Sequence, residues 1–192
     1  GRTLSVAGTG STVFSGQIID GGTFASGLSV AGNVTLSASN SFTGGVSVSG
    51  YLSINHPNAL GTGALSFSSG TGTFDNVTGT PITVANDIRM FGASGTFAGA
   101  GGSTFTTTGS LAYGGGNKTM TVASGTLGIG SLSGTSSDVR FTKAGAGTLV
   151  IAGAASPTTT GTVRLTGGLT LAGNAAALGS GTLEMQNAAT FR

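Results

Sequence analysis

The chain contains no cysteine and no tryptophan, only three prolines, and a single histidine among its 192 residues. Without cysteine it can form neither a disulfide scaffold nor a thiolate metal site, a composition that suits a protein exported through oxidising compartments. Charged residues make up only 6% of the chain. Its seven basic residues lie far apart, so they predict no basic patch for nucleic acid, and the pI near 9.5 reflects very few titratable groups.

Long hydrophobic runs and strong helix formers are also scarce. No window approaches the 18 apolar residues of a membrane span, and the opening GRTLSVAGTG lacks the charged-then-apolar profile of a signal peptide. We therefore expect no membrane span in this chain. If the protein is secreted, we expect this chain to be its mature form or a fragment. Glycine, serine, threonine and asparagine stand where helices favour alanine, leucine, glutamate and lysine, which argues against a coiled coil or helical bundle.

Glycine, in contrast, accounts for 38 residues, near three times its usual share of about 7%. Such a composition often marks disorder, but the mean hydropathy is positive at +0.32, with 38% hydrophobic residues. The apolar residues also alternate with small or polar ones. Examples of these alternating pairs are Val34 and Leu36, Leu52 and Ile54, Leu127 and Ile129, Leu149 and Ile151, and Leu169 and Leu171. Alternation places both members of a pair on one face, so each pair predicts a short, half-buried β-strand.

The predicted strands are closely spaced and end at glycine or asparagine, without the two-residue Asn-Gly or Asp-Gly turns typical of hairpins. This favours a chain that coils rather than one that folds back. We predict an all-β fold, a β-solenoid of short strands with about seven to nine coils and a length on the order of 40 Å. Single phenylalanines should recur at inward positions and stack along the axis, as for Phe24, Phe67, Phe91, Phe97 and Phe105.

Self-similarity supports the solenoid. The segment from Gly44 to Phe67 recurs from Thr160 to Met185, with Val46 matching Val163, for example. The offset indicates a unit of about 115 to 118 residues, so one unit covers residues 2–117 and an incomplete second unit covers residues 118–192. We expect a single continuous solenoid segment over residues 1–192.

The second copy carries the residues of a known repeat. Residues 141–151, FTKAGAGTLVI, followed by Gly161, Val163, Gly167 and Leu169, resemble the autotransporter-associated β-strand repeat. The earlier copy departs from the pattern, since SVAGNVTL replaces the segment with Lys143 and its glycines. The resemblance covers essentially the whole chain. It implies a right-handed parallel β-helix of the kind found in passenger domains of bacterial autotransporters, export to the cell surface, and a stalk or adhesive role.

A hydrolytic triad is not expected, because the one histidine, His56, lies in the sequence NHPN, which predicts a turn, and the matching turn of the second copy has no histidine. The acidic residues are isolated in sequence: Asp20, Asp75, Asp87, Asp138 and Glu184. Two of them precede a basic residue by two positions, so we expect Asp87 with Arg89, and Asp138 with Arg140, to project outward as surface ion pairs. Stacking could still bring acids of different coils together, as in polysaccharide-cleaving β-helix enzymes. We nevertheless predict no catalytic residue and no enzyme.

Cofactor and metal sites are not expected either. The glycines of residues 114–119, GGGNKT, resemble a phosphate-binding loop, but asparagine precedes the lysine and no helix is expected to follow. Calcium-binding β-roll units are missing from the sequence. Asn33, Asn76 and Asn117 begin glycosylation sequons, at a frequency expected by chance in so threonine-rich a chain. The threonine runs 106–108 and 158–160 suggest an ice- or sugar-binding face, but that function needs threonine in register on every coil, which two isolated runs do not provide.

These observations predict an extracellular structural β-solenoid, a stalk or fibre segment of a bacterial surface or secreted protein. Neither end of the sequence resembles a cap, so we expect either continuation into a longer solenoid or end-to-end self-association. An adhesin that binds host or matrix glycans through lateral loops near Tyr51 and Tyr113 is the alternative, and a polysaccharide-cleaving enzyme is a more distant one. No nucleic-acid partner is expected.

Overall fold

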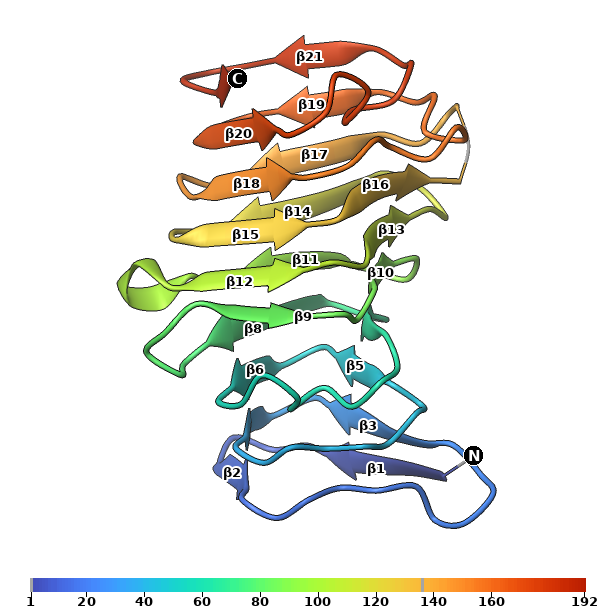
Figure 1. Cartoon of the computed structure of the whole chain (residues 1–192), viewed down its shortest axis with the longest axis vertical. Helices are drawn as coiled ribbons and strands as arrows, with labels where there is room; N and C mark the ends of the chain where they lie inside the picture. The colour runs from blue at the N-terminus through green and yellow to red at the C-terminus, as the bar shows by residue number, and fades with distance from the viewer. Residues whose placement is uncertain (1, 136) are drawn as a thin grey trace.

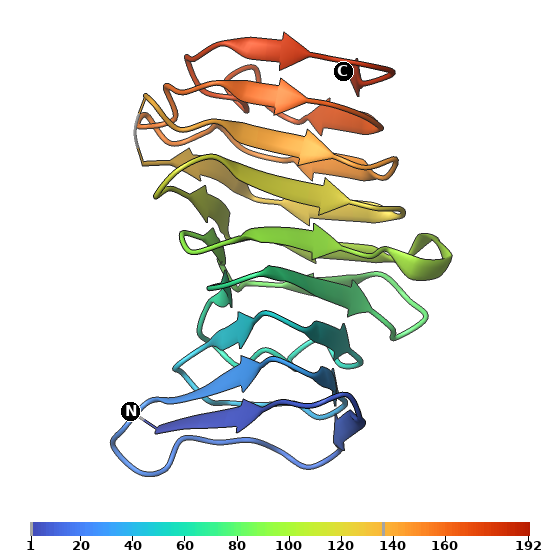
Figure 2. The same ribbon diagram turned by 180° about the vertical axis from the view of Figure 1, so that it is seen from behind.

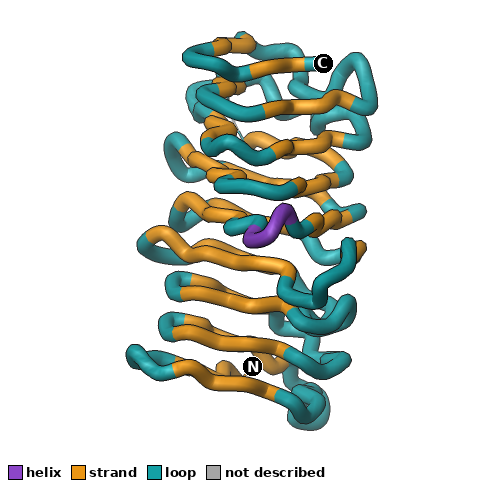
Figure 3. Tube along the Cα trace, turned by 90° about the vertical axis from the view of Figure 1, so that its left-hand side faces the viewer, coloured by secondary structure: helices purple, strands orange, loops and turns teal. Residues whose placement is uncertain are grey.

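The computed structural model describes residues 2–135 and 137–192, which wind into a parallel β-solenoid of about nine coils (Figure 1). The predicted all-β class, the β-helix architecture and the number of coils are confirmed. The one helical element in the described residues is a single 3-10 turn, Ala100–Gly102, at a corner of the solenoid (Figure 3). Within that part of the chain, no helix is long and apolar enough to cross a bilayer.

Three parallel sheets form the sides of the solenoid. The first sheet contains β1 (Arg2–Val6), β3 (Ser26–Val30), β5 (Val46–Val48), β7 (Leu65–Phe67), β10 (Ile88–Met90), β13 (Ser110–Tyr113) and β16 (Ser131–Gly134). The second contains β2 (Ser11–Phe14), β4 (Asn33–Leu36), β6 (Tyr51–Ile54), β8 (Thr71–Asn76), β11 (Ser94–Phe97), β14 (Lys118–Val122), β17 (Phe141–Ala144), β19 (Val163–Leu165) and β21 (Leu183–Met185). The third contains β9 (Ile82–Val84), β12 (Thr104–Thr107), β15 (Thr126–Ile129), β18 (Thr148–Ile151), β20 (Leu169–Ala172) and β22 (Thr190–Phe191).

The coils change shape along the axis. The first three coils have strands of the first and second sheets and are closed by a loop, whereas the next four have strands of all three sheets. In the last two coils the strands belong to the second and third sheets, and a loop replaces the first sheet. The second sheet is therefore the one that has a strand in every coil.

The core consists of inward-facing columns of apolar side chains. In-register pairing stacks like residues, as in the first-sheet column of Leu4, Leu28, Val46, Leu65, Ile88, Leu111 and Leu132. All of these except Leu4 in the first coil are buried. Burying each such side chain contributes about 1.5–3 kcal/mol, so the columns account for the alternation seen in the sequence.

Aromatic residues join the three sheets in the middle of the solenoid. Phe74 of the second sheet lies 5.2 Å from Phe97 of the next coil and 5.2 Å from Phe105 of the third sheet, measured between ring centroids. Phe67 of the first sheet completes the group at 6.1 Å from Phe74. Its ring occupies space left by Gly95, where a Cβ would lie 2.6 Å from a ring carbon. The expected stacking along the axis therefore occurs, but the cluster also extends across the core.

Not every phenylalanine that the sequence suggests for the interior lies there. Phe24 and Phe91 are 65% and 46% exposed. Neither belongs to a strand, so the alternation that directs side chains inward does not apply to them.

The two copies of the internal repeat have the same order of elements but occupy different sheets. The first copy runs β5, β6, β7, through the first and second sheets, whereas the second runs β19, β20, β21, through the second and third. The inward residues that flank the corner are Val48 and Leu52 in the first copy and Leu165 and Thr170 in the second, so the second corner is one residue longer. A shift of one residue reverses the faces of a strand.

Leu169 and Leu171 illustrate this reversal. The repeat matches them with Leu52 and Ile54, which are fully buried, and so predicts that they face the core. They lie instead on the outer face, half-buried, while Thr170 between them is paired with the inward Leu149. The prediction of an inward-facing pair is wrong here because the longer corner reverses the strand.

The shift places the Thr170 side chain in the core, and the energetic cost of burying it can be tested. Its hydroxyl is buried and has no hydrogen-bond partner among the described residues. Since a buried unpaired hydroxyl costs about 1–3 kcal/mol, we expect Thr170→Val to raise the free energy of unfolding by about 1 kcal/mol, measured by urea denaturation.

Thr107 provides the matched control. It is equally buried, but its hydroxyl donates to the Asn86 carbonyl and accepts from the Gly109 N–H. Thr107→Val should lower the free energy of unfolding. Equal effects of the two substitutions would contradict the assignment of Thr170 as an unpaired group.

Candidate functional site

A buried carboxylate beside a cleft is the most site-like feature of the solenoid surface. Asp75, near the end of β8, is 1% exposed and accepts hydrogen bonds from the Ser103 hydroxyl at 3.1 Å and the Tyr51 hydroxyl at 3.3 Å. The Ala100 N–H, at 3.4 Å, is a third donor. The cleft, of about 390 Å³, lies between residues 75–81 and 100–104. These partners come from the coils on either side of Asp75, so the carboxylate joins three successive coils.

The polar groups of this site are satisfied internally. Burial, followed by the charge of Asp75, raises the pKa of the Tyr51 hydroxyl, which therefore remains a donor at neutral pH. The neighbouring Asn76 amide donates to the carbonyls of Thr80 and Thr104 at 2.7 and 2.8 Å. Hydrolysis of a glycosidic bond requires two carboxyl groups facing one another. Among the described contacts Asp75 has no second acid, so its geometry is that of a structural tie.

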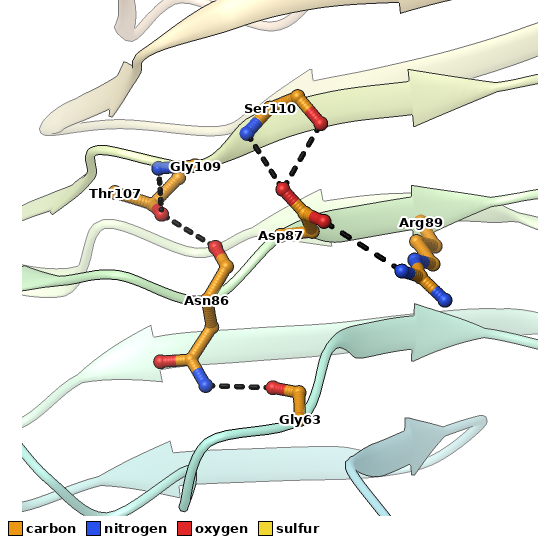
Figure 4. Close-up of polar contacts among 7 residues, drawn as sticks. All are labelled: Gly63, Asn86, Asp87, Arg89, Thr107, Gly109 and Ser110. Carbon is orange, nitrogen blue, oxygen red and sulfur yellow. Dashed lines mark hydrogen bonds and ion pairs between the residues drawn. The ribbon is translucent and has the colours of Figure 1, made fainter.

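Asp87 and Arg89 form the expected surface ion pair, with 3.6 Å between their charged groups (Figure 4). The prediction of this pair is confirmed. The same carboxylate accepts the Ser110 N–H at 2.9 Å and the Ser110 hydroxyl at 3.0 Å from the next coil. Asn86, beside it, donates to the Gly63 carbonyl at 2.7 Å on the preceding coil. Polar side chains at this corner thus tie together three coils.

The pair predicted between Asp138 and Arg140 is not found among the ion pairs of the described residues. Asp138 accepts from the Ser137 hydroxyl at 3.4 Å, and the backbone N–H of Arg140 donates to the Asn117 side chain at 2.9 Å. The prediction assumed strand alternation, but β17 begins only at Phe141. Asp138 lies in the preceding turn, where side chains two residues apart do not share a face.

The remaining candidates also have local partners. His56 lies in the expected turn, where its Nδ1 accepts the Asn58 N–H at 3.0 Å. Asp20 accepts the backbone N–H of Ser26 at 2.7 Å and of Thr43 at 3.1 Å, and these bonds lower the pKa of its carboxyl. Within the described residues, no three side chains of His, Cys, Asp or Glu lie close enough to hold a metal ion.

Tyr113, expected near a binding loop, lies in the core. Its ring is completely buried, 5.3 Å from that of Phe141, and burial raises the pKa of its hydroxyl. It pairs in register with Gly134, where a Cβ would lie 2.7 Å from the hydroxyl oxygen. The Tyr113 side chain is therefore a core residue, because β13 directs it inward, while the prediction of a binding loop near it stays a prediction.

Residues 114–119 do not form a phosphate-binding loop. Gly115 and Gly116 have positive φ angles of 65° and 106°, and the turn leads directly into strand β14 instead of a helix. The Lys118 ammonium folds back to donate to the Gly115 carbonyl at 3.2 Å.

Lys143 is the most unusual charged residue of the chain, since its side chain points into the core and is 0% exposed. Its Nζ donates to the carbonyls of Gly145 at 2.8 Å, Gly147 at 2.6 Å and Gly167 at 2.7 Å. The first two belong to the corner between β17 and β18, and the third to the same corner of the next coil. The sequence motif with Lys143 and its glycines is thus a corner in which one cation binds three backbone carbonyls.

The glycines are required because the backbone closes tightly around the amine. Gly145 and Gly168 have φ angles of 84° and 64°, and a Cβ at Gly168 would lie 2.5 Å from the Lys143 Nζ. Burial lowers the pKa of the amine to about 8, so it remains mainly protonated at neutral pH, and the ammonium has three N–H donors for three carbonyls. The site binds its own backbone and has no room for a substrate.

Comparisons of the chain with protein-family models, curated proteins and solved structures give no match.

The lowered pKa of Lys143 predicts a measurable pH dependence. The folded chain loses the proton near pH 8, whereas the unfolded chain holds it to the ordinary pKa of 10.5. Because the unfolded state then binds more protons, the free energy of unfolding should rise by about 1 kcal/mol between pH 8.5 and 9.5. Urea denaturation at several pH values measures this slope.

Lys143→Met should abolish this slope. At pH 7 it should also lower the free energy of unfolding by about 3 kcal/mol, since three buried carbonyls lose their donor. Lys118→Met, which removes a buried lysine with one hydrogen bond, should retain the slope. A slope that persists in Lys143→Met would show that another group titrates. Above pH 10 the raised pKa values of Tyr51 and Tyr113 act in the opposite direction, so this range is omitted.

Proposed function

We propose that this chain is a structural segment, a stalk or fibre module, of an extracellular bacterial surface or secreted protein similar to the autotransporter passengers. The observation that carries the proposal is that the buried and corner polar side chains form hydrogen bonds within the solenoid. Asp75, Asp87 and Lys143 each bond to groups of neighbouring coils, so their hydrogen bonds hold the stack together. A stack held in this way transmits load along its axis, which suits a stalk.

The ends of the solenoid support a role in a longer assembly. At one end Leu4 is 46% exposed, although its column is buried in the coils that follow, and at the other end Leu183 and Met185 are exposed. The outer edges of the end strands offer free N–H and C=O groups. We propose that further coils cover these ends, either from a longer solenoid or from another copy stacked end to end.

Adhesion to glycans through lateral loops is the second candidate. Tyr51 favours it, since this half-buried tyrosine lines a cleft of about 430 Å³ with Asn33 and Thr73, where its ring can contact a sugar ring. A glycan array with Tyr51→Ala as the control variant tests this candidate. Loss of a specific signal in that variant would favour the adhesin over the stalk.

End-to-end assembly predicts a concentration-dependent increase in length. We expect sedimentation velocity and negative-stain electron microscopy to show rods on the order of 40 Å that join into unbranched fibres one solenoid wide as the concentration rises. Leu4→Lys, which places a charge on the end surface, should prevent joining.

Ser29→Lys is the matched control, because Ser29 lies on the outer face of β3 in the adjacent coil. It should leave the joining unchanged. Rods that remain single at all concentrations would contradict self-assembly and favour a segment of a longer stalk. Compact particles would contradict the stalk itself.

A further inference from the structure

The outer face of the second sheet carries pairs of hydroxyl side chains on successive coils. Each pair consists of two residues separated by one inward-facing residue. The members are Thr71 and Thr73 on β8, Ser94 and Thr96 on β11, Thr119 and Thr121 on β14, and Thr142 on β17. We call these seven residues the hydroxyl array.

Strand register aligns the array into two columns parallel to the solenoid axis. Thr73 pairs with Thr96, and Thr96 with Thr121, in one column. Thr71 pairs with Ser94, and Thr119 with Thr142, in the other. Parallel strands lie about 4.8 Å apart and alternate residues about 6.6 Å apart, so the array is a regular two-dimensional grid. Figure 2 shows these strands one above another on the side that faces the viewer.

The hydroxyls of the array face outward, and all except that of Ser94 are free of hydrogen-bond partners among the described residues. Ser94 accepts the Thr119 N–H at 2.9 Å, and within the described residues the threonine hydroxyls of the array form no hydrogen bond to the protein. The inward-facing residues of the same strands, such as Phe97 and Met120, are fully buried and fix the strands. Since threonine is also stiff at χ1, the positions of the hydroxyl and methyl groups are set in advance.

The seven residues of the array are themselves uncharged. Two cations lie beside them: Arg140 is half-buried directly before β17, and Lys118 on β14 is buried with its ammonium on the Gly115 carbonyl. Asp75 on β8 is buried and partnered, and Lys143 on β17 points inward. The column of Thr142 ends in the next coils at Arg164 and Glu184, which form an ion pair at 2.6 Å. The array is therefore a neutral area with a defined boundary.

We propose that the hydroxyl array binds the surface of ice. The register that isolated threonine runs lack is present here over the four successive coils of β8, β11, β14 and β17, so the binding face is confined to these coils. The occupant of such a face must be neutral and periodic, and it must both donate and accept hydrogen bonds at fixed positions. Ordered water in a crystal meets these three requirements. Recognition of a soluble sugar would instead depend on aromatic stacking and buried polar groups, and the array offers only hydroxyl and methyl groups.

The third sheet provides an internal comparison. Its outer face carries one column of three threonines, Thr104, Thr126 and Thr148. A second column holds only Thr83 and Thr106 and continues with Gly128 and Val150. Only β12 therefore carries a threonine pair, and no grid forms. Thr126 lies five residues after Thr121 in the same coil, on the outer face of the third sheet. Both threonines are half-buried, so Thr126 is a matched position outside the array.

The experiment measures thermal hysteresis and partition of the whole chain into a growing ice hemisphere, with Thr121→Lys as the array variant and Thr126→Lys as the control. We expect hysteresis and partition for the unchanged chain and for Thr126→Lys, and loss of both for Thr121→Lys. Circular dichroism checks folding, and Thr96→Lys is the second array variant if Thr121→Lys does not fold.

Three outcomes would overturn the proposal. The unchanged chain could show no hysteresis and remain in the liquid, or Thr121→Lys and Thr126→Lys could reduce activity equally. The chain could also bind insoluble cellulose or chitin but not ice, which would assign the face to a crystalline polysaccharide. None of these results depends on end-to-end assembly, so the test is independent of the proposed stalk role.

Discussion

The rest of this structure depends on in-register parallel pairing between successive coils. Each strand places its inward residues directly on those of the preceding coil, so an apolar residue gains a buried neighbour above and below. Stability then accumulates along the axis, coil by coil, as expected for repeat architectures. A single additional residue at a corner exchanges the inward and outward side chains of the strand that follows, as the corner between Leu165 and Thr170 does for β20.

The corners carry the constraints that hold the register. Lys143 binds carbonyls of two coils, and Asp87 and Asn86 bond to the coils on either side. These polar groups are few, which agrees with the low charge content of the chain, and most are engaged in structural hydrogen bonds. Because the corners and the core hold the stack, the outer faces need not contribute to stability and can differ from sheet to sheet. The outer face of the second sheet varies in this way along the axis: it carries the hydroxyl array in the middle coils and the ion pair of Arg164 with Glu184 in the last two.

Sequence reasoning was most accurate where local alternation decides the structure. Leu52 with Ile54 and Leu149 with Ile151 are inward-facing pairs on short strands, as expected. It was wrong where a residue lies outside a strand, as for Asp138 and Phe91, or where the corner length differs, as for Leu169 and Leu171. It also missed the role of Lys143, although the motif named the residue, because the three carbonyls that it binds come together only when two coils stack.

The sequence by itself determined the solenoid, since alternating apolar pairs, frequent glycine and the absence of hairpin turns favour a coiling chain of short strands. Only the tertiary structure decided which side chains meet across coils. The partners of Asp75 come from the coils before and after its own. The column of Thr73, Thr96 and Thr121 forms although these residues are unevenly spaced in the chain. The physical reason is that corner lengths vary from coil to coil, so the register is set by packing and backbone pairing and has no fixed period in the sequence.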